Sequence, residues 1–186
     1  MIHRKYFFDN LRYYLFKSFR QEQVDGLNLF LDWYDTENPP APERYHLDDR
    51  MLAYVFATTY HETAATMQPV SEYGSAAYLR SKPYYPWYGR GYVQLTWETN
   101  YRRQDTKLGL SGALIADPDL ALDPTIALKV ILGGMVDGDF TGKKLGDFFT
   151  DQLTDWYDAR TIVNGHDRAS DIARYAELFS NAITHL

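Results

Sequence analysis

Two glutamates ten residues apart, Glu62 and Glu72, are the residues of this sequence best placed for acid–base chemistry. Apolar residues recur at three- and four-residue steps from Leu52 to Thr59, and the same spacing continues to Glu62. The Glu62 carboxyl group is therefore expected at the end of a buried helix face. Partial desolvation disfavours the charged form of a carboxyl group, as a general acid requires. The alternative is an ordinary surface glutamate near a helix end.

Glu72 lies in a segment rich in Gly, Pro, Ser and Tyr, residues 67–97, which predicts loops and one short strand over 92–96. If Glu72 faces Glu62 across a cleft, the two carboxyl groups form the pair that inverting glycoside hydrolysis uses. The acid protonates the leaving oxygen, and the base activates a water molecule from the opposite face, at a separation of about 6.5–9.5 Å. The sequence leaves this separation open.

Other chemistries fail on spacing. The pair His61-Glu62 lacks the second histidine of a zinc-protease motif, because Ala65 occupies that position. Residues 138–144 are one residue short of a phosphate-binding loop, and Phe148 stands where a calcium loop needs glutamate. The sequence contains no cysteine, which excludes disulfides, cysteine zinc ligands and a thiol nucleophile. We expect no metal and no organic cofactor.

Aromatic residues make up 16% of the chain, and many of them cluster near Glu72. The residues expected to form a cleft wall for sugar rings are Tyr84, Tyr85, Trp87, Tyr88 and Tyr92. The alternative is a tyrosine-rich turn packed onto the core. The residues expected in the core from their helical spacing are Phe7, Phe8, Phe16 and Phe56. Thr96 and Asn100 have side chains suited to holding a water molecule or an acetamido group.

The chain has 186 residues and a formal net charge of −6. We expect residues 1–186 to form a single catalytic domain, with residues 1–45 as a helical part packed on it. The acidic balance argues against a nucleic-acid partner. No stretch approaches the ~18 apolar residues of a membrane span, and polar residues interrupt the first 16 residues where a signal peptide would be apolar. We expect a monomer without membrane insertion.

Helical periodicity predicts most of the secondary structure. Helices are expected over residues 5–32, 47–65, 123–135, 151–163 and 171–183, and a proline-rich loop over 36–43. Asp48 and Asp49 favour the start of the second helix, because the helix dipole stabilises acidic residues in a first turn. With the small strand region, these helices predict an α+β fold that is mainly α.

Several motifs in a fixed order resemble glycoside hydrolase family 19, which contains plant-type chitinases and many bacteriophage endolysins. The motifs are HET (61–63), Glu72, YGRGYVQLTWETNY (88–101), ADPDLALDPTIAL (116–128) and IVNG (162–165), and the resemblance covers about residues 20–180. The segments that look closer to the phage-type members are QVDGLNLFLDW (23–33), YVFATTYHETAATMQPVSEYG (54–74), FTGKKL (140–145) and ARTIVNGHDRASDIARYAELF (159–179).

This resemblance implies roles for individual residues. Glu62 occupies the position of the family's general acid, and Glu72 that of the second acidic residue, the base, in the short phage-type members. Thr96, with Asn100, matches the residues that hold the nucleophilic water and completes the expected catalytic set. The expected substrate-binding residues are His61, Tyr84, Trp87, Tyr88, Gln94, Asn100 and Asn164.

The resemblance also implies a lysozyme-like fold, in which a small β-sheet and loop lobe flanks a substrate groove. One position departs from the family pattern. Members usually carry a basic residue just before the last Ile-x-x-Tyr segment, where this chain has Asp171. Arg168 or Arg174 could supply the charge, and neither is assigned a catalytic role.

The leading functional hypothesis is an endolysin that hydrolyses β-1,4 bonds of peptidoglycan with inversion. The alternatives are a chitinase acting on the same backbone without peptides, and an inactive sugar-binding module. The expected partner is thus peptidoglycan or a chitin-like polysaccharide. We expect synthesis in the cytoplasm and action on the cell wall, after release by a separate membrane-permeabilising partner.

Overall fold

The computed structural model describes residues 1–40 and 45–186, and its central helix is α3 (Asp49–Glu62). The Asp48 side chain caps this helix by accepting a hydrogen bond from the backbone N–H of Met51, as is common for an aspartate at this position. Every residue from Leu52 to Thr59 is buried, so α3 is enclosed on all sides. The predicted helix over 47–65 is confirmed, with an end at Glu62 instead of residue 65.

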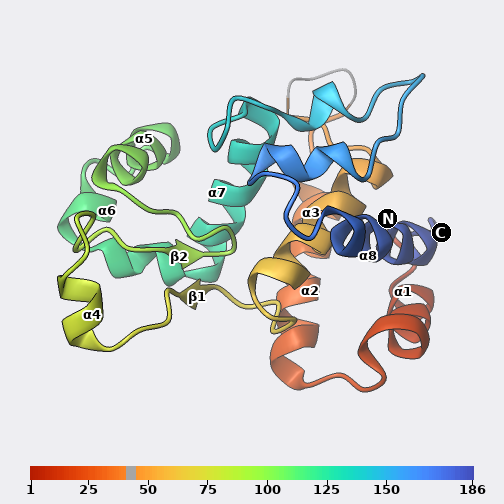
Figure 1. The fold of residues 1–186 in the computed structure, drawn as a ribbon. Coiled ribbons are helices and arrows are strands. Elements are labelled where there is room, and N and C mark those ends of the chain that lie inside the picture. The colour runs from red at the N-terminus through yellow and green to blue at the C-terminus, as the bar shows by residue number, and fades with distance from the viewer. Residues whose placement is uncertain (41–44) are drawn as a thin grey trace.

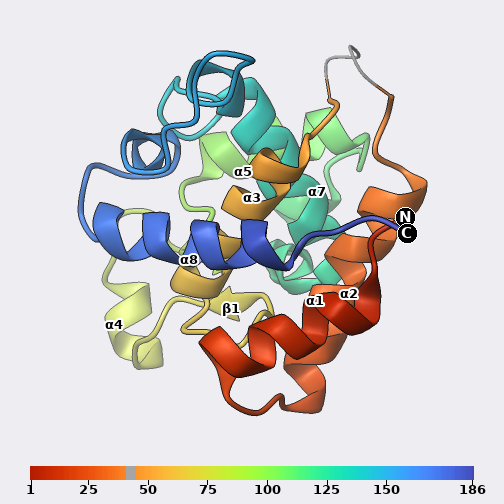
Figure 2. The same cartoon turned by 90° about the vertical axis from the view of Figure 1, so that its right-hand side faces the viewer.

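Two helices at the chain ends cover α3 (Figures 1 and 2). They are α1 (Arg4–Leu11) and α8 (Ala169–Ala182). Rings from all three helices meet in the core, where Phe56 stacks on Phe179 at 5.2 Å between centroids and Phe7 lies 5.5 Å from Phe56. Phe7 and Phe56 are fully buried, and Phe8 and Phe16 are partly buried against this core, which confirms their predicted structural role.

The N-terminal helical region is broken where the sequence predicted one continuous helix over 5–32. A π-helical turn, η1 (Arg12–Phe16), follows α1, and α2 (Gln21–Thr36) starts only after Lys17 has taken a φ of 60°. The bend brings Phe16 within 4.6 Å of Phe19 and 5.2 Å of Tyr60, measured between ring centroids. A straight helix would leave these rings in water. The expected loop over 36–43 is confirmed at residues 37–40, and residues 41–43 lie outside the described residues.

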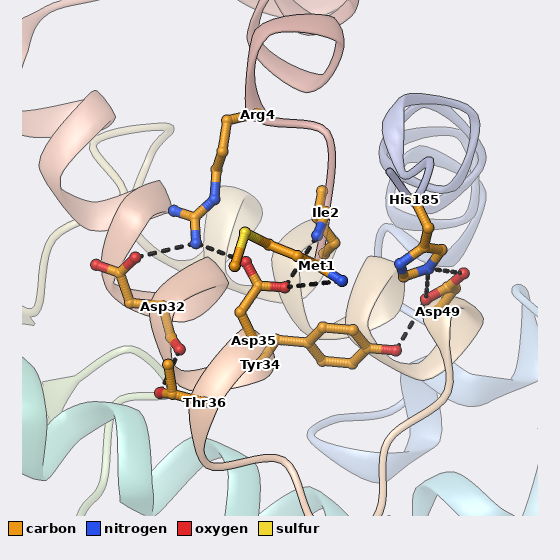
Figure 3. A network of polar contacts seen from close by, with 9 residues as sticks. All are labelled: Met1, Ile2, Arg4, Asp32, Tyr34, Asp35, Thr36, Asp49 and His185. Carbon is orange, nitrogen blue, oxygen red and sulfur yellow. Dashed lines mark hydrogen bonds and ion pairs between the residues drawn. The ribbon is translucent and has the colours of Figure 1, made fainter.

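Polar contacts at Asp35 and Asp49 join the two chain termini to α2 and α3 (Figure 3). Asp35 accepts hydrogen bonds from the backbone N–H of Ile2 at 2.9 Å and from the Arg4 guanidinium at 2.8 Å. Asp49 accepts from Tyr34 at 2.8 Å and contacts His185 Nε2 at 2.9 Å. Ile2 also forms a β-bridge with His185. These contacts hold α1 firmly against the rest of the protein.

A smaller lobe carries the two-stranded sheet (Figure 1). Strands β1 (Val70–Ser71) and β2 (Arg90–Gly91) are antiparallel, with Val70 opposite Gly91. The prediction of a strand over 92–96 is wrong: residues 92–94 form a turn that ends in a bridge between Arg90 and Leu95. Tyr92 and Val93 are both buried although they lie in a turn. The apolar residues that suggested a strand are therefore core residues of this turn.

Further helices of 3 to 14 residues complete the chain. They are α4 (Ala76–Arg80), α5 (Glu98–Leu108), α6 (Ala113–Ala116), η2 (Pro118–Leu122), α7 (Pro124–Asp137), η3 (Leu145–Asp147) and η4 (Asp158–Ile162). The predicted start of α7 is confirmed, because Asp123 accepts hydrogen bonds from the backbone N–H groups of Thr125 and Ile126. The predicted last helix is also confirmed as α8. Together the elements confirm a mainly helical α+β fold.

The predicted helix over 151–163 is wrong except for the 3-10 helix η4. Residues 150–154 instead form a turn around Arg50 of α3. The Arg50 guanidinium donates hydrogen bonds to the carbonyls of Thr150 and Leu153 and to the Thr154 hydroxyl. Because these carbonyls accept hydrogen bonds from a residue about a hundred positions away, they are less available for the hydrogen bonds of a helix, and the turn is favoured.

No helix within residues 1–40 and 45–186 is both long enough and apolar enough to cross a membrane. The same described residues contain no cluster of three or more His, Cys, Asp or Glu side chains arranged to hold a metal ion.

A tight turn after α3 leads from Glu62 toward β1. Ala64, Ala65 and Met67 all have positive φ, a conformation that costs non-glycine residues about 1–3 kcal/mol each. Helix α2 supports this turn: Gln23 Nε2 donates to the Ala65 carbonyl at 2.8 Å. Gly26 lies directly against the turn, so a Cβ added there would come within 1.9 Å of the Met67 carbonyl oxygen.

We expect Gly26→Ala to lower the free energy of unfolding by about 1–3 kcal/mol, because the added methyl group must displace backbone. Urea denaturation followed by circular dichroism measures this change. The matched control is Gly133→Ala in α7, where a Cβ meets nothing within 4 Å. This control should raise stability by about 0.5–1 kcal/mol, the usual helical gain from glycine to alanine. Equal effects of the two substitutions would contradict the close packing at Gly26.

Candidate active site

Glu62 ends α3 in an ion pair with a buried arginine. Arg160 Nη1 lies 2.6 Å from Glu62 Oε1, and the exposed fractions of the two side chains are 3% and 18%. The sequence predicted that Glu62 lies at the end of a buried helix face, where its carboxyl group is partly desolvated. The structure places a guanidinium at one carboxylate oxygen, while Oε2 receives no hydrogen bond within the part of the chain that the structure describes.

Arg160 is itself held in place by the segment that follows it. Its Nε donates to the carbonyl of Asp167 at 3.0 Å, and its own carbonyl accepts from the backbone N–H of Asn164 at 3.1 Å. The Thr141 hydroxyl donates to the carbonyl of Thr161, which ties η4 to the preceding loop. The guanidinium therefore reaches Glu62 from a fixed backbone position.

The sequence left open which basic residue serves the site, and the structure places Arg160, not Arg168 or Arg174, against Glu62. Arg168 is 64% exposed and pairs with Asp171 at 3.3 Å. The Arg174 guanidinium lies over the ring of Tyr175, 4.9 Å from its centroid. Arg160 comes from the ARTIVNG segment, which the motif comparison had already singled out. A sequence pattern could not separate it from the other two arginines, because only burial distinguishes them.

Glu72 follows β1 and is held by donors on both oxygens. The Tyr84 hydroxyl donates to Oε1 at 2.8 Å, and the backbone N–H of Gly89 donates to Oε2 at 3.1 Å. The Glu72 backbone N–H donates in turn to the Gly89 carbonyl at 2.7 Å. The hydrogen bond to Glu72 raises the pKa of Tyr84, so this phenol remains a donor through the neutral range. The structure thus confirms Tyr84 as a direct neighbour of Glu72.

Arg90 organises the loop that carries these donors, and sequence reasoning had not selected it. Its side chain is 3% exposed; Nε donates to Asp119 at 2.7 Å, and Nη1 donates to the Pro86 and Tyr88 carbonyls. The guanidinium also lies 3.7 Å from the centroid of the Tyr88 ring. Burial raises the pKa of Tyr101, which bonds to Arg90 and to the Tyr88 carbonyl, to about 12.

The remaining polar residues of the predicted site are engaged with nearby backbone. Gln94 Nε2 donates to the Val70 carbonyl at 3.0 Å and links the turn after β2 to β1. The Thr96 hydroxyl donates to the Gln94 carbonyl, and Asn100 Nδ2 donates to the Thr96 carbonyl. Asn164 is exposed next to Arg160, and His61 is half-buried in the last turn of α3. A hydroxyl that donates one hydrogen bond still has lone pairs with which to accept another.

The aromatic residues near Glu72 divide in a way the sequence did not predict. Tyr92 is 1% exposed and packs against Phe30 at 5.1 Å, so its expected contact with sugar is wrong. Trp87 is half-buried against the core, and its indole Nε1 is buried. The exposed large aromatics of this lobe are Tyr73, Tyr78, Tyr85 and Trp97, of which only Tyr85 was predicted.

A hollow of about 450 Å³ lies away from the two glutamates, between α2, α5 and α7. Its walls include Trp33, Leu108 and Leu132, together with the charged groups of Lys107 and Lys129. Neither Glu62 nor Glu72 lines it. The catalytic hypothesis therefore rests on side-chain chemistry at Glu62 and Glu72, and the substrate groove beside them stays a prediction.

Comparison with known proteins gives two kinds of likeness. Over 82 residues, the chain is 33% identical to an acidic 26 kDa endochitinase of Solanum lycopersicum; the match covers 44% of this chain and 32% of that protein. The fold matches chitinase C from Streptomyces griseus HUT6037 with a TM-score of 0.59 and 19% identity, over 96% of this chain and 90% of the other. A mutant of chitinase C matches with a TM-score of 0.53. No family model matches the chain.

The fold is chitinase-like. The local sequence match to an endochitinase and the fold match to chitinase C both agree with the resemblance that the motifs indicated. The fold match extends over nearly the whole chain, whereas the aligned segment spans only about a third of the curated relative.

We expect the Glu62–Arg160 pair to show strong thermodynamic coupling. Arg160→Met should lower the free energy of unfolding by about 2–4 kcal/mol, slightly less than for a fully buried pair, because Glu62 is partly exposed. Glu62→Gln keeps an acceptor for Arg160 and should cost about 1–2 kcal/mol. In a double-mutant cycle with urea, the combined effect should fall short of the sum by more than about 1 kcal/mol.

The control for this cycle is the exposed pair of Glu98 and Arg102 on α5, where the same exchanges should change stability by less than about 0.5 kcal/mol. Additive effects at Glu62 and Arg160 would show that the ion pair does not form in solution.

Proposed function

We propose that the protein is an inverting glycoside hydrolase that cleaves β-1,4 bonds between N-acetylhexosamines of the bacterial cell wall. The observation that carries this proposal is the unequal environment of two glutamates. Glu62 has one oxygen bound to Arg160 and one that receives no hydrogen bond from residues 1–40 or 45–186, whereas Glu72 accepts hydrogen bonds on both oxygens. Pairs of carboxyl groups in different environments take different roles in acid–base catalysis.

Glu62 is the proposed general acid. A proton carried on Oε2 is available for the leaving glycosidic oxygen, because Arg160 engages only Oε1. When the proton leaves, the carboxylate acquires its full negative charge next to a guanidinium fixed at 2.6 Å. Arg160 thus stabilises the state that forms as the bond breaks, which is the stage at which an electrostatic contact increases the rate.

Glu72 is the proposed general base. The Tyr84 hydroxyl and the Gly89 N–H fix the direction of its carboxylate, and each oxygen keeps a lone pair with which to accept a proton from water. The Thr96 hydroxyl and the Asn100 amide belong to the same lobe and are the proposed partners of that water molecule. Attack on the face opposite the leaving group then inverts the anomeric carbon.

The choice of polymer depends on separate arguments. The motif segments of the HET and ARTIVNG regions resemble phage-type members, which supports peptidoglycan. The similar proteins are an endochitinase and a chitinase, which supports chitin as the second candidate. Both polymers contain β-1,4-linked N-acetylhexosamines, so the proposed chemistry at Glu62 and Glu72 is the same for both.

We expect Glu62→Gln to reduce hydrolysis of the preferred polymer by about 10²–10⁴-fold, because the amide cannot donate the transferred proton as an acid does. Clearing of a peptidoglycan suspension and release of reducing ends from chitin measure the rate on each polymer. Circular dichroism verifies that the variant is folded.

The matched control is Glu98→Gln on α5, which removes a partly exposed glutamate that pairs with Arg102 and should leave the rate unchanged. If the wild type and Glu62→Gln degrade both polymers at the same rate, the proposed mechanism is wrong. Binding without any hydrolysis by the wild type would support the inactive sugar-binding module.

We expect the first product of hydrolysis to be the α-anomer, since inversion of a β bond gives this configuration. Proton NMR during the first minutes, before mutarotation, observes it directly. A β-anomer would exclude Glu72 as the base of a single displacement. Mass spectrometry of the reducing ends then separates cleavage after N-acetylmuramic acid from cleavage after N-acetylglucosamine.

A further inference from the structure

The outer face of the N-terminal helical region carries three exposed tyrosines. Tyr6 is 45% exposed, Tyr14 60% and Tyr13 79%. The rings of Tyr13 and Tyr14 meet edge to face with their centroids 4.6 Å apart. Exposed aromatic rings that form a contiguous group commonly mark an interaction site, whereas single ones need no explanation.

Basic residues surround these tyrosines, in contrast to the rest of the protein. Residues 1–20 contain five Lys or Arg and one Asp, which leaves 14 basic against 24 acidic residues in the remainder of the chain. Arg12 and Lys5 share the acidic partner Asp9. Lys17 adds an exposed charge after η1. The negative net charge of the protein therefore conceals a local excess of positive charge.

Two open hollows adjoin the tyrosine pair. One, of about 410 Å³, is lined by Asp9, Arg12, Tyr13 and Lys17. The other, of about 460 Å³, is lined by Tyr6, Asn10, Tyr14, Leu178 and Asn181. The first hollow thus combines a ring with two cations, and the second combines rings with two side-chain amides. Rings with amides and charges are the side chains that recognise sugars bearing polar substituents.

This face is rigid because the opposite side of the segment is buried. Phe7 and Leu11 are fully buried, and Phe8 packs on Phe19 at 5.4 Å. The Arg4 guanidinium is held between Asp32 and Asp35 of α2 (Figure 3). A ligand that docks on such a prearranged surface loses less affinity to the ordering of side chains.

The segment is also connected to the candidate active site. Phe16, the last residue of η1, packs edge to face on Tyr60 with centroids 5.2 Å apart, and Tyr60 lies two residues before Glu62. Figure 1 shows the start of α2 near the end of α3, where Gln23 of α2 donates a hydrogen bond to the Ala65 carbonyl. A polymer that binds this face is therefore held near the end of the helix that carries Glu62.

We propose that the N-terminal tyrosine surface (Tyr6, Tyr13 and Tyr14 with Lys5, Arg12 and Lys17) binds a polysaccharide strand that carries carboxylate groups. The tyrosine rings stack on sugar faces, and the cations pair with the carboxylates. Peptidoglycan has this chemistry, because its peptide stems carry carboxylates, and chitin lacks them. The inference rests on the proposed function for its choice of glycan, and it goes further by assigning a second binding surface that selects between the two polymers.

The experiment measures binding in the Glu62→Gln background, so that the polymer is not degraded. Sedimentation with insoluble peptidoglycan should show a dissociation constant at least tenfold higher after Tyr13→Ala and Tyr14→Ala together. Tyr13→Phe and Tyr14→Phe should keep most of the binding, because the rings remain. With active Glu62, the double alanine variant should hydrolyse short soluble oligosaccharides at the wild-type rate, which shows that it is folded.

The contribution of charge is tested with matched lysines. Lys17→Gln should weaken binding to peptidoglycan about threefold and reduce its salt dependence, because screening weakens exposed ion pairs. Lys143→Gln removes the same charge from another exposed position and should have no effect. Binding to chitin should be weaker than binding to peptidoglycan and should not change in Lys17→Gln.

Three results would overturn the proposal: unchanged peptidoglycan binding in the double alanine variant, an equal loss on chitin and peptidoglycan in Lys17→Gln, or stronger binding to phosphatidylglycerol vesicles than to peptidoglycan. The last result would indicate a membrane surface instead. The two proposals are tested by different measurements. The hydrolytic mechanism is tested by the rate of hydrolysis of the Glu62→Gln variant, whereas the tyrosine surface is tested by binding in that background.

Discussion

The ion pair between Glu62 and Arg160 joins side chains 98 positions apart in the chain, and the candidate active site depends on it. A charge as buried as Arg160 is costly unless it is paired, so the fold must bring the end of α3 and the segment of η4 together. The surrounding structure fixes both the end of α3 and Arg160. Helix α3 is enclosed by α1 and α8, and Arg160 is held through its own backbone and through Asp167. The chemistry proposed for Glu62 therefore follows from the packing of three helices.

A second buried arginine has a similar task in the smaller lobe. Arg90 binds two carbonyls of the loop before it, stacks on Tyr88 and contacts Asp119. Through that loop it positions Gly89, whose N–H donates to Glu72. Each glutamate is thus oriented by a buried guanidinium: Glu62 by direct contact, and Glu72 through the backbone. The strained turn after α3, supported by Gln23 and Gly26, begins the connection between the two.

Charge is distributed unevenly along this acidic chain. An overall charge of −6 would oppose association with an anionic wall, because like charges repel over the Debye length. Residues 1–20, however, carry five basic residues and one acidic residue, and these basic residues lie in the same segment as three exposed tyrosines. Salt screens interactions between exposed charges beyond about 8 Å at physiological ionic strength, so the local excess of positive charge can act on a ligand in contact with it despite the negative net charge.

The local features of this protein can be predicted from its sequence. Aspartates at the helix starts and apolar periodicity were sufficient to place α3 and α7, and periodicity placed α8. The same periodicity placed Glu62 at the end of the buried face of α3. These signals are reliable because caps and helix faces involve neighbours within four residues. The tertiary structure alone decided that Arg160 and not Arg168 or Arg174 meets Glu62, that Tyr92 is buried, and that Arg50 holds residues 150–154 in a turn. The physical reason is the same in each case: the deciding hydrogen bonds and ring contacts connect residues tens to a hundred positions apart, and no local pattern encodes them.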